Sequence, residues 1–353
     1  MTSTVRELAG HTGQLATMSL GAFELADGSV LPELTVTYRH DGRAPADGPQ
    51  IVVVHALTGS ADAAGDWWAP LIGPGRALDT DRVGVICANL LGGCYGTTGP
   101  TSTDAATGRS YGRSFPAITT RDQARALWRL LDTLGFGEVA LVTGGSLGGM
   151  VALELALERP PDVRAVTAIA APAATGPLAL AWNRIQLELI DRLGVDGLAL
   201  ARELAMTTYR SEDDFATRFG RAVGEDGRFA VASYLDHQGH KLVERFDVNT
   251  YRVLVGAMDA HDIGDGRGGV SAALSRFAAG GPTLTRVRIA GDILYGPAQV
   301  RSLVADAADS GADATYREIT SAKGHDAFLV EWDQLASILR EALSRACLDV
   351  GVT

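Results

Sequence analysis

A chain of 353 residues is long enough for one large domain with an insertion, or for two domains. Hydrophobic residues make up 46% and charged residues 21%, which is typical of a globular protein with a sizeable core. The formal net charge is −11 and no run of Lys or Arg occurs. This balance argues against a nucleic-acid partner, because proteins that bind nucleic acid usually present a basic patch.

The sequence carries no recognisable signal for export or membrane insertion. Residues 1–20 lack the basic stretch and apolar run of a signal peptide. No run of 18 or more apolar residues indicates a membrane span. Cys87, Cys94 and Cys347 are odd in number and irregularly spaced, so we expect reduced thiols rather than a disulfide framework or a metal site. Together these features predict a cytoplasmic protein.

Short apolar runs alternate with helical patterns along most of the chain. We expect strands at residues 51–54, 83–88, 139–143, 163–170 and 287–290, and helices at residues 121–134, 150–158, 297–308 and 331–346. The run at 51–54 is continuously apolar and β-branched, as in strands that are buried on both faces. The alternation predicts an α/β fold with a mostly parallel sheet flanked by helices.

The middle of the chain breaks this alternation. Strand signals stop near residue 177, and the segment up to residue 264 reads as several short helices. We therefore predict a core formed by residues 1–176 and 265–353, carrying a helical lid inserted at residues 177–264. The glycine-rich residues 264–269 are expected to form a flexible return to the core.

A candidate nucleophile lies between a strand pattern and a helix pattern. Residues 144–148 read GGSLG and match G-x-S-x-G, the nucleophile elbow of the α/β-hydrolase fold. The glycines let the backbone turn sharply, so that the hydroxyl of Ser146 is exposed. Glycine accounts for 42 of the 353 residues, so a packing turn is the alternative. The apolar strand before the motif and the apolar helix after it favour a nucleophile.

A serine nucleophile needs a base, and in this fold the acid and the base follow the serine in that order. Four histidines follow Ser146, and three of them fall in the helical segment. The fourth, His325, follows the strand-like residues 314–320 and precedes the terminal helix pattern. Asp292 ends the apolar run RVRIAGD, where a turn or helix cap is the alternative role. Chain order predicts the triad Ser146, Asp292 and His325.

The oxyanion formed during acyl transfer needs two backbone N–H donors. One is expected from Leu147, the residue after the nucleophile, and the other from Leu57 in the loop after an early strand. His55 adjoins this loop but precedes the nucleophile in the chain. We therefore interpret His55 as a structural hydrogen-bonding residue and not as the base.

Longer motifs around these positions are distinctive: HALTG (55–59), CANLLGGCYGTTGPTS (87–102), YGRSFPAITTRD (111–122), GGSLGGM (144–150), DGRFAVASYLDHQGHKLVERFD (226–247) and GHDAFLVE (324–331). Through them the chain resembles the homoserine O-acetyltransferase family of methionine biosynthesis, from about residue 15 to residue 345. The resemblance implies an α/β-hydrolase core with a helical lid, and homodimers formed through the lid helices.

The resemblance also implies a reaction and its substrates. The serine takes an acetyl group from acetyl-CoA, a co-substrate, and the hydroxyl of L-homoserine then attacks the acyl-enzyme, without a further cofactor or a metal. By the same resemblance, Arg202 binds the carboxylate of the acceptor, Asp326 binds its ammonium group, and Tyr209 lines the pocket. Without the resemblance, Arg202 would read as a helix-surface residue and Asp326 as a helix cap.

Alternatives remain at this point. Relatives on the same scaffold acylate serine or use succinyl-CoA, and the segment between Ile190 and Gly197 is shorter here than in most relatives, which leaves the acceptor open. A carboxylesterase or thioesterase would use the same triad. The complete order of the triad argues against a non-catalytic binding protein.

Overall fold

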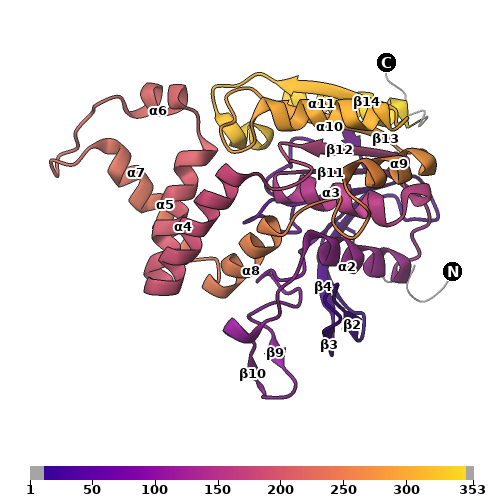
Figure 1. The fold of residues 1–353 in the computed structure, drawn as a ribbon, viewed down its shortest axis with the longest axis horizontal. Helices are drawn as coiled ribbons and strands as arrows, with labels where there is room; N and C mark the ends of the chain where they lie inside the picture. The colour runs from indigo at the N-terminus through magenta and orange to yellow at the C-terminus, as the bar shows by residue number, and fades with distance from the viewer. Residues whose placement is uncertain (1–11, 347–353) are drawn as a thin grey trace.

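The computed structural model describes residues 12–346 and places an eight-stranded sheet at the centre of the molecule (Figure 1). In spatial order the strands are β1 (Leu15–Ser19), β4 (Thr35–Gly42), β8 (Gly84–Ala88), β5 (Gln50–Val54), β11 (Val139–Gly145), β12 (Ala165–Ile169), β13 (Thr283–Ile289) and β14 (Ala314–Ile319). The pairs β1–β4 and β4–β8 are antiparallel, and all pairs from β8 to β14 are parallel. The predicted mostly parallel sheet is confirmed.

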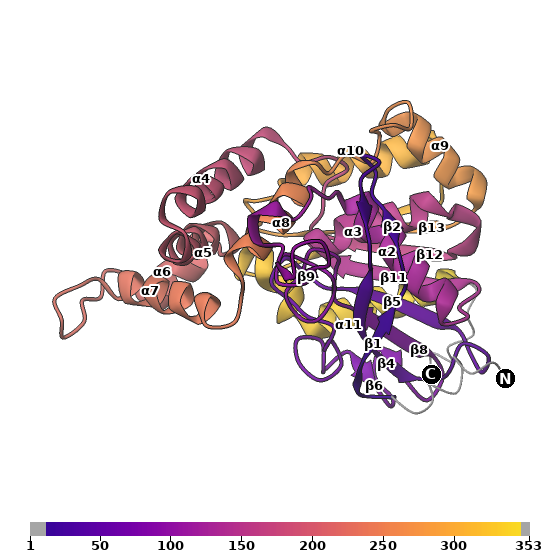
Figure 2. The ribbon, with the colours of Figure 1, turned by 90° about the horizontal axis from the view of Figure 1, so that it is seen from below.

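Helices cover both faces of the sheet (Figures 1 and 2). They are α2 (Thr120–Thr133), α3 (Leu147–Glu158), α9 (Val270–Gly280) and α10 (Pro297–Asp309) on one face, and α11 (Trp332–Arg345) on the other. Buried residues form one hydrophobic cluster on each face, because the central strands are apolar on both sides. No helix within residues 12–346 is both long enough and apolar enough to cross a membrane.

Short elements connect these layers. They are β2 (Phe23–Glu24), β3 (Val30–Leu31), β6 (Ile72–Gly73), β7 (Leu78–Asp79), β9 (Thr103–Asp104), β10 (Arg109–Ser110), and the 3-10 turns η1 (Gly112–Ser114), η2 (Pro160–Asp162) and η3 (Gly324–Leu329). The last of them, η3, connects β14 to α11. It lies at the carboxyl edge of the parallel strands, where α/β folds usually place ligands.

Six helices lie between β12 and β13, and we call the first five of them the inserted helices. They are α4 (Pro177–Leu193), α5 (Val195–Tyr209), α6 (Glu212–Phe219), α7 (Ala230–Val243) and α8 (Val248–Asp259). Of these, α4 to α7 extend away from the sheet at one end of the molecule (Figure 1). Gly194, with a φ of 61°, is the single residue between α4 and α5. A left-handed glycine allows this abrupt reversal, and it accounts for the short connection seen in the sequence.

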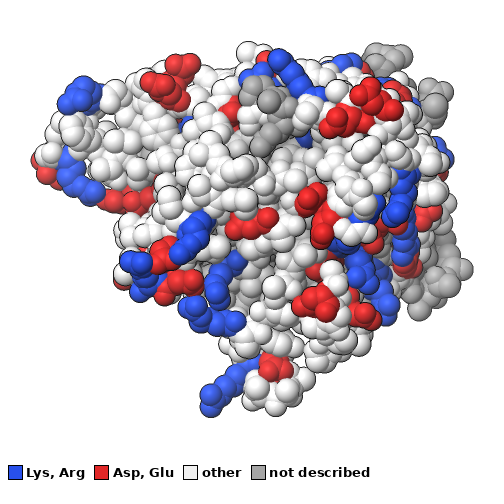
Figure 3. All heavy atoms as spheres, in the orientation of Figure 1, with Lys and Arg blue, Asp and Glu red and all other residues white. Residues whose placement is uncertain are grey.

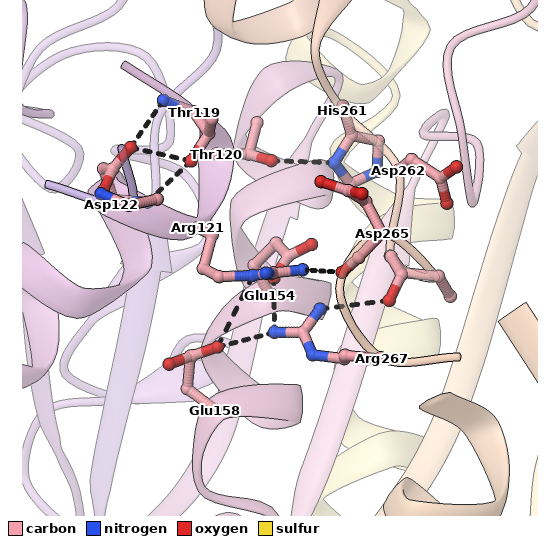
Figure 4. Close-up of polar contacts among 12 residues, drawn as sticks. Thr119, Thr120, Arg121, Asp122, Glu154, Glu158, His261, Asp262, Asp265 and Arg267 are labelled. Carbon is pink, nitrogen blue, oxygen red and sulfur yellow. Dashed lines mark hydrogen bonds and ion pairs between the residues drawn. The ribbon is translucent and has the colours of Figure 1, made fainter. Parts of the chain in front are cut away.

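The return from the inserted helices to the core is held by buried charges (Figure 4). The guanidinium of Arg267 donates to Glu154 at 2.7 Å and to Glu158 at 2.6 Å, and Glu154 is 1% exposed. Arg121 of α2 also pairs with Glu154, at 3.4 Å. Beside them, His261 Nδ1 lies 2.9 Å from a threonine hydroxyl of α2. The sequence predicted a flexible return from its glycines, whereas the structure anchors this segment to α2 and α3.

Candidate active site

Ser146 lies on a strained turn between β11 and α3. Its φ of 57° and ψ of −126° are unusual for a residue with a side chain. A Cβ atom on Gly144 or on Gly148 would lie 2.6 Å or 2.2 Å from the carbonyl oxygen of Val54, so both positions require glycine. The turn around Ser146 therefore packs directly against β5. The two glycines of the G-x-S-x-G motif are required because a side chain at either position would clash with this strand.

Asp292 and His325 meet at the carboxyl edge of the sheet. Asp292 comes three residues after β13, and its Oδ2 accepts a hydrogen bond from His325 Nδ1 at 2.8 Å. Its other oxygen accepts from the backbone N–H groups of Leu294 and Tyr295, at 2.8 and 3.2 Å. The carboxylate is thus fixed from two sides. Because Nδ1 carries the proton that it donates, Nε2 of His325 keeps a free lone pair.

The elbow and the histidine turn pack against each other through Phe328. A Cβ atom on Gly145 would lie 2.5 Å from the Phe328 ring, so η3 touches the residue that precedes Ser146. The same ring lies edge-on to His325, with 5.9 Å between the centroids. Nε2 of His325 is buried and has no hydrogen-bond partner within residues 12–346. This packing places a free imidazole nitrogen beside the serine elbow.

Aromatic rings enclose the imidazole of His325. The centroids of Tyr295 and Tyr209 lie 5.4 and 5.7 Å from it. Burial alone would lower the pKa of His325, but the neighbouring Asp292 carboxylate opposes this effect, and the net result is a raised pKa. A base of this kind accepts a proton more readily than a free imidazole.

The loop after β5 is held rigidly next to the elbow. His55 Nδ1 lies 2.7 Å from the Ala56 carbonyl oxygen, and its Nε2 accepts from the Leu90 N–H at 3.1 Å. Burial lowers the pKa of His55 to about 4, so this histidine is neutral and fully engaged. Arg245 Nη1 donates to the carbonyl oxygen of Thr58 at 2.9 Å. The loop that carries Leu57 is therefore tied to both the core and the inserted helices.

Leu147 directly follows Ser146. It is the first residue of α3 and is fully buried, and its N–H belongs to the helix N-terminus, where intrahelical acceptors are missing. The carbonyl oxygen of Ser146 accepts from the N–H groups of Gly149 and Met150, at 2.9 and 3.1 Å. The first turn of α3 is thus ordered, and the positive end of its dipole lies at the serine.

The inserted helices bring further charged groups to the histidine. The guanidinium carbon of Arg202 lies 5.5 Å from the ring centroid of Tyr209, and both residues belong to α5. Asp326 forms an ion pair with Arg210 at 3.3 Å, and burial raises the pKa of Asp326 although Arg210, His325 and Arg202 oppose this effect. The structure therefore gathers Arg202, Tyr209 and Asp326 around the base. It also adds Arg210, which the sequence did not predict.

Comparisons with known proteins identify the family and the fold of this chain. A family model described as alpha/beta hydrolase fold matches residues 49–256. A homoserine O-acetyltransferase of Moorella thermoacetica is 43% identical over 357 residues, which cover 93% of this chain and 95% of the relative. At this identity and coverage the two chains share a family. This chain belongs to the homoserine O-acetyltransferase family.

Solved structures support the fold assignment of this member of the homoserine O-acetyltransferase family. A homoserine O-acetyltransferase from Bacillus anthracis has a TM-score of 0.87 at 23% identity, covering 94% of this chain and 97% of the other. Esterase E22 has a TM-score of 0.86 at 22% identity, covering 94% and 99%. Both similarities establish the α/β-hydrolase fold. The fold is thus shared by transferases and esterases, and the reaction must be argued from the site and the close relatives.

Several residues of the site were not predicted as site residues from the sequence. Arg210, Arg245 and Phe328 reach it from segments that lie far from Ser146 in the chain. Each reads as an ordinary surface or core residue when taken alone. A sequence signal does exist for two of them, since Phe328 lies within the distinctive segment 324–331 and Arg245 within the distinctive segment 226–247.

Proposed function

We propose that this chain transfers an acetyl group from acetyl-CoA to the hydroxyl of L-homoserine through an acyl-enzyme on Ser146. The supporting observation is the combination of 43% identity to a homoserine O-acetyltransferase over nearly the whole chain with a buried Asp292–His325 pair beside a strained serine elbow. The reaction uses only side chains and backbone amides, with acetyl-CoA as co-substrate and no metal or other cofactor.

In the first step, the Oγ of Ser146 attacks the carbonyl carbon of the thioester. Nε2 of His325 takes the hydroxyl proton as the bond forms, and the imidazolium is stabilised by Asp292. The N–H groups of Leu57 and Leu147 are proposed to stabilise the oxyanion of the tetrahedral intermediate. When this intermediate collapses, the C–S bond breaks and the sulfur of CoA takes the proton from His325. The products are free CoA and acetyl-Ser146.

In the second step, the acceptor hydroxyl attacks the acetyl ester. Nε2 of His325 now removes the proton of that hydroxyl, and the same oxyanion donors serve again. The ester bond to Ser146 breaks, and Oγ recovers the proton from His325. The product is the O-acetylated amino acid. Water can attack the same ester, so transfer depends on excluding water while the acceptor is positioned.

The acceptor is proposed to bind between Arg202 and Asp326. A guanidinium can grip a carboxylate with two parallel hydrogen bonds, and a buried carboxylate next to the base can hold an ammonium group. Tyr209 is proposed to line the pocket between them, since its ring contacts both Arg202 and His325. The tight packing of these residues suits a small amino acid.

Replacing Arg202 with methionine is expected to raise the KM for homoserine by roughly 100-fold, because a charge-assisted pair to the carboxylate is lost. The stem of the side chain keeps its packing on Tyr209 in this variant. Formation of the acyl-enzyme from acetyl-CoA is expected to stay within about threefold of the wild type. Steady-state kinetics with both substrates tests this, and an unchanged KM for homoserine would exclude Arg202 from the acceptor site.

Two neighbouring reactions are the alternatives on this scaffold. Serine differs from homoserine by one methylene group, a difference worth only about 10–200-fold in a pocket, and succinyl-CoA is a possible donor. A panel of acceptors with each donor, followed by free thiol release, separates them. We expect the highest kcat/KM for acetyl-CoA with homoserine. Equal thiol release without any amino acid would instead indicate an esterase or thioesterase.

The inserted helices are proposed to act as a lid, with the core formed by residues 1–176 and 265–353 and the lid by residues 177–264. They are also proposed to form a homodimer interface, because α4 and α5 leave apolar side chains exposed. These are Leu178 (57%), Ile185 (50%), Leu193 (50%), Val195 (53%) and Leu200 (39%). An exposed apolar face of this kind is typical of a subunit interface.

Replacing Ile185 with aspartate is expected to convert a dimer into a monomer, because a charge in the middle of an apolar interface is costly. The matched control is Leu15→Asp on β1, which is 56% exposed and lies in the sheet. Light scattering coupled to gel filtration measures both. A wild-type protein that is already monomeric at micromolar concentration would contradict the proposed dimer.

The remaining proposals concern location and partners. We propose that the protein acts in the cytoplasm, where reduced thiols persist. Cys87 is a buried free thiol and Cys94 is also unpaired, while Cys347 lies outside the described residues. Positive and negative side chains are interspersed over the face drawn in Figure 3, in keeping with a net charge of −11. This distribution supports small-molecule substrates and not nucleic acid.

A further inference from the structure

A chain of buried polar side chains crosses the inserted helices and ends at Tyr209. The hydroxyl of Tyr251, on α8, donates to Oε1 of Gln186, on α4, at 2.5 Å. The hydroxyl groups of Tyr251 and Tyr209 face each other, so that each influences the pKa of the other. Tyr251 therefore connects Gln186 on α4 to Tyr209 on α5. Tyr251 and Gln186 are only 0% and 4% exposed.

The chain continues beyond Gln186 to a carboxylate. Nε2 of Gln186 donates to Oδ1 of Asn183 at 3.4 Å and to the carbonyl oxygen of Trp182 at 3.3 Å. Nδ2 of Asn183 donates to Oδ1 of Asp259, the last residue of α8, at 2.7 Å. An ionised carboxylate only accepts, so it fixes the orientation of both amides and, through Gln186, of the Tyr251 hydroxyl. The side chains of α4 and α8 in this network are thereby held in one orientation.

Tyr209 converts this network into a constraint on the active site. Its ring is tilted by 31° to the His325 imidazole, at 5.7 Å between the centroids. The guanidinium carbon of Arg202 lies 5.5 Å from the same ring. The ring of Tyr209 therefore lies against both the imidazole of His325 and the guanidinium of Arg202. A rotation of this ring would move the guanidinium relative to Nε2 of His325.

We propose that Tyr251 and Gln186 are positioning residues for the acyl acceptor, and that they act by holding the ring of Tyr209 between His325 and Arg202. This inference rests on the proposed function, since it assigns Tyr251 and Gln186 to the second half of that reaction. The donor half needs only the elbow, the Asp292–His325 pair and the oxyanion donors. The acceptor half needs, in addition, the correct distance between the base and the carboxylate-binding guanidinium.

A purely structural role of the network predicts a different result. Loss of one buried hydrogen bond would then lower the stability and would affect both half-reactions alike, or neither. A positioning role predicts different effects on the two half-reactions, acylation of Ser146 and transfer to the acceptor. It affects the attack of the acceptor and leaves the acylation of Ser146 by acetyl-CoA untouched.

The experiment compares the two half-reactions in Tyr251→Phe, which deletes one oxygen atom. The burst of free thiol from acetyl-CoA in the absence of an acceptor measures acylation, and steady-state turnover with homoserine measures transfer. We expect the KM for homoserine to rise on the order of tenfold, while the burst rate stays within about twofold of the wild type. The matched control is Tyr38→Phe, at a buried tyrosine of β4, for which both values are expected to stay unchanged.

A second pair of variants tests the acceptor atom of Gln186. Gln186→Met fills the same space without an oxygen, whereas Gln186→Glu keeps an oxygen that can accept from Tyr251. We expect the KM for homoserine to rise in Gln186→Met and to recover at least in part in Gln186→Glu. These two variants decide the question if Tyr251→Phe does not fold.

Two results would overturn the proposal. One is a KM for homoserine within twofold of the wild type in both Tyr251→Phe and Gln186→Met. The other is a burst rate that falls by the same factor as transfer. Failure of the proposed function is recognised separately, because the wild-type burst would then proceed without any stimulation of turnover by homoserine.

Discussion

Replacing Ser146 with alanine is expected to lower kcat by a factor on the order of 10⁵ to 10⁶. The variant loses the Oγ atom that is proposed to carry the acetyl group, while the fold is expected to be retained because Gly144 and Gly148 still pack against β5. Binding of substrates and the oxyanion donors remain, so a weak background reaction is possible. Free thiol release from acetyl-CoA in the presence of homoserine measures the loss.

The variant must be compared with a serine that has no part in the reaction. Ser275→Ala, on the exposed side of α9, is a suitable control and is expected to retain full activity. Mass spectrometry of the intact protein after incubation with acetyl-CoA provides a second measurement. The wild type is expected to gain one acetyl group and Ser146→Ala none. Residual turnover of a tenth of the wild type in Ser146→Ala would show that another group carries the acetyl.

Replacing Asp292 with asparagine is expected to lower kcat by about 10⁴-fold. In the wild type, Oδ2 of Asp292 accepts the Nδ1 proton of His325, which leaves Nε2 free to act as a base. An amide can keep the acceptor for the N–H groups of Leu294 and Tyr295, but it then presents its NH₂ group to the imidazole. The imidazole responds by moving its proton to Nε2, and the base is lost.

The pH dependence of Asp292→Asn provides a signature that a folding defect would not give. The base must be neutral, so activity is lost as the pH falls through the pKa of His325. The pKa is raised above its ordinary value in the wild type by Asp292, against the opposing effect of burial. Removal of this charge leaves the effect of burial opposed only by Asp326, so the pKa of His325 falls and the acid limb of kcat/KM is expected to move to lower pH. An acid limb of kcat/KM at the same pH in Asp292→Asn and the wild type would contradict the role of Asp292.

The core of the fold could be predicted, and the residues of the proposed triad could be chosen, because both depend on local signals. The buried parallel strands read as apolar runs, and the triad residues follow the carboxyl ends of β11, β13 and β14 in chain order. The helix α3 begins directly after Ser146, as the elbow motif requires. Local sequence therefore indicated where in the fold these residues lie.

The antiparallel edge of the sheet could not be predicted in this way. Strand β4 contains Arg39, His40 and Asp41, which break the apolar pattern. In the structure such charges are paired with residues that lie far away in the sequence. For example, Nη1 of Arg39 donates to Oδ1 of Asp62 at 2.5 Å. The sequence shows the charge but not its partner. A strand with such a composition is therefore missed.

The parts of the site that come from the inserted helices are hidden for the same reason. Arg210 reaches Asp326 and Arg245 reaches Thr58 only because α5 and the segment after α7 fold back over the sheet edge. The link from Tyr251 to Tyr209 joins α8 to α5. The residues in these contacts are not separated by a fixed number of positions, so no sequence motif predicts the contacts. Long-range packing decides them.

The most direct test of the proposed acetyl transfer is the rate of free thiol release from acetyl-CoA by the purified protein, measured with and without L-homoserine. We predict one rapid burst equivalent to the enzyme concentration without the acceptor, and sustained turnover only when homoserine is added. Sustained release at the same rate without an amino acid, or no stimulation by homoserine at any concentration, would contradict acyl transfer from Ser146 to homoserine.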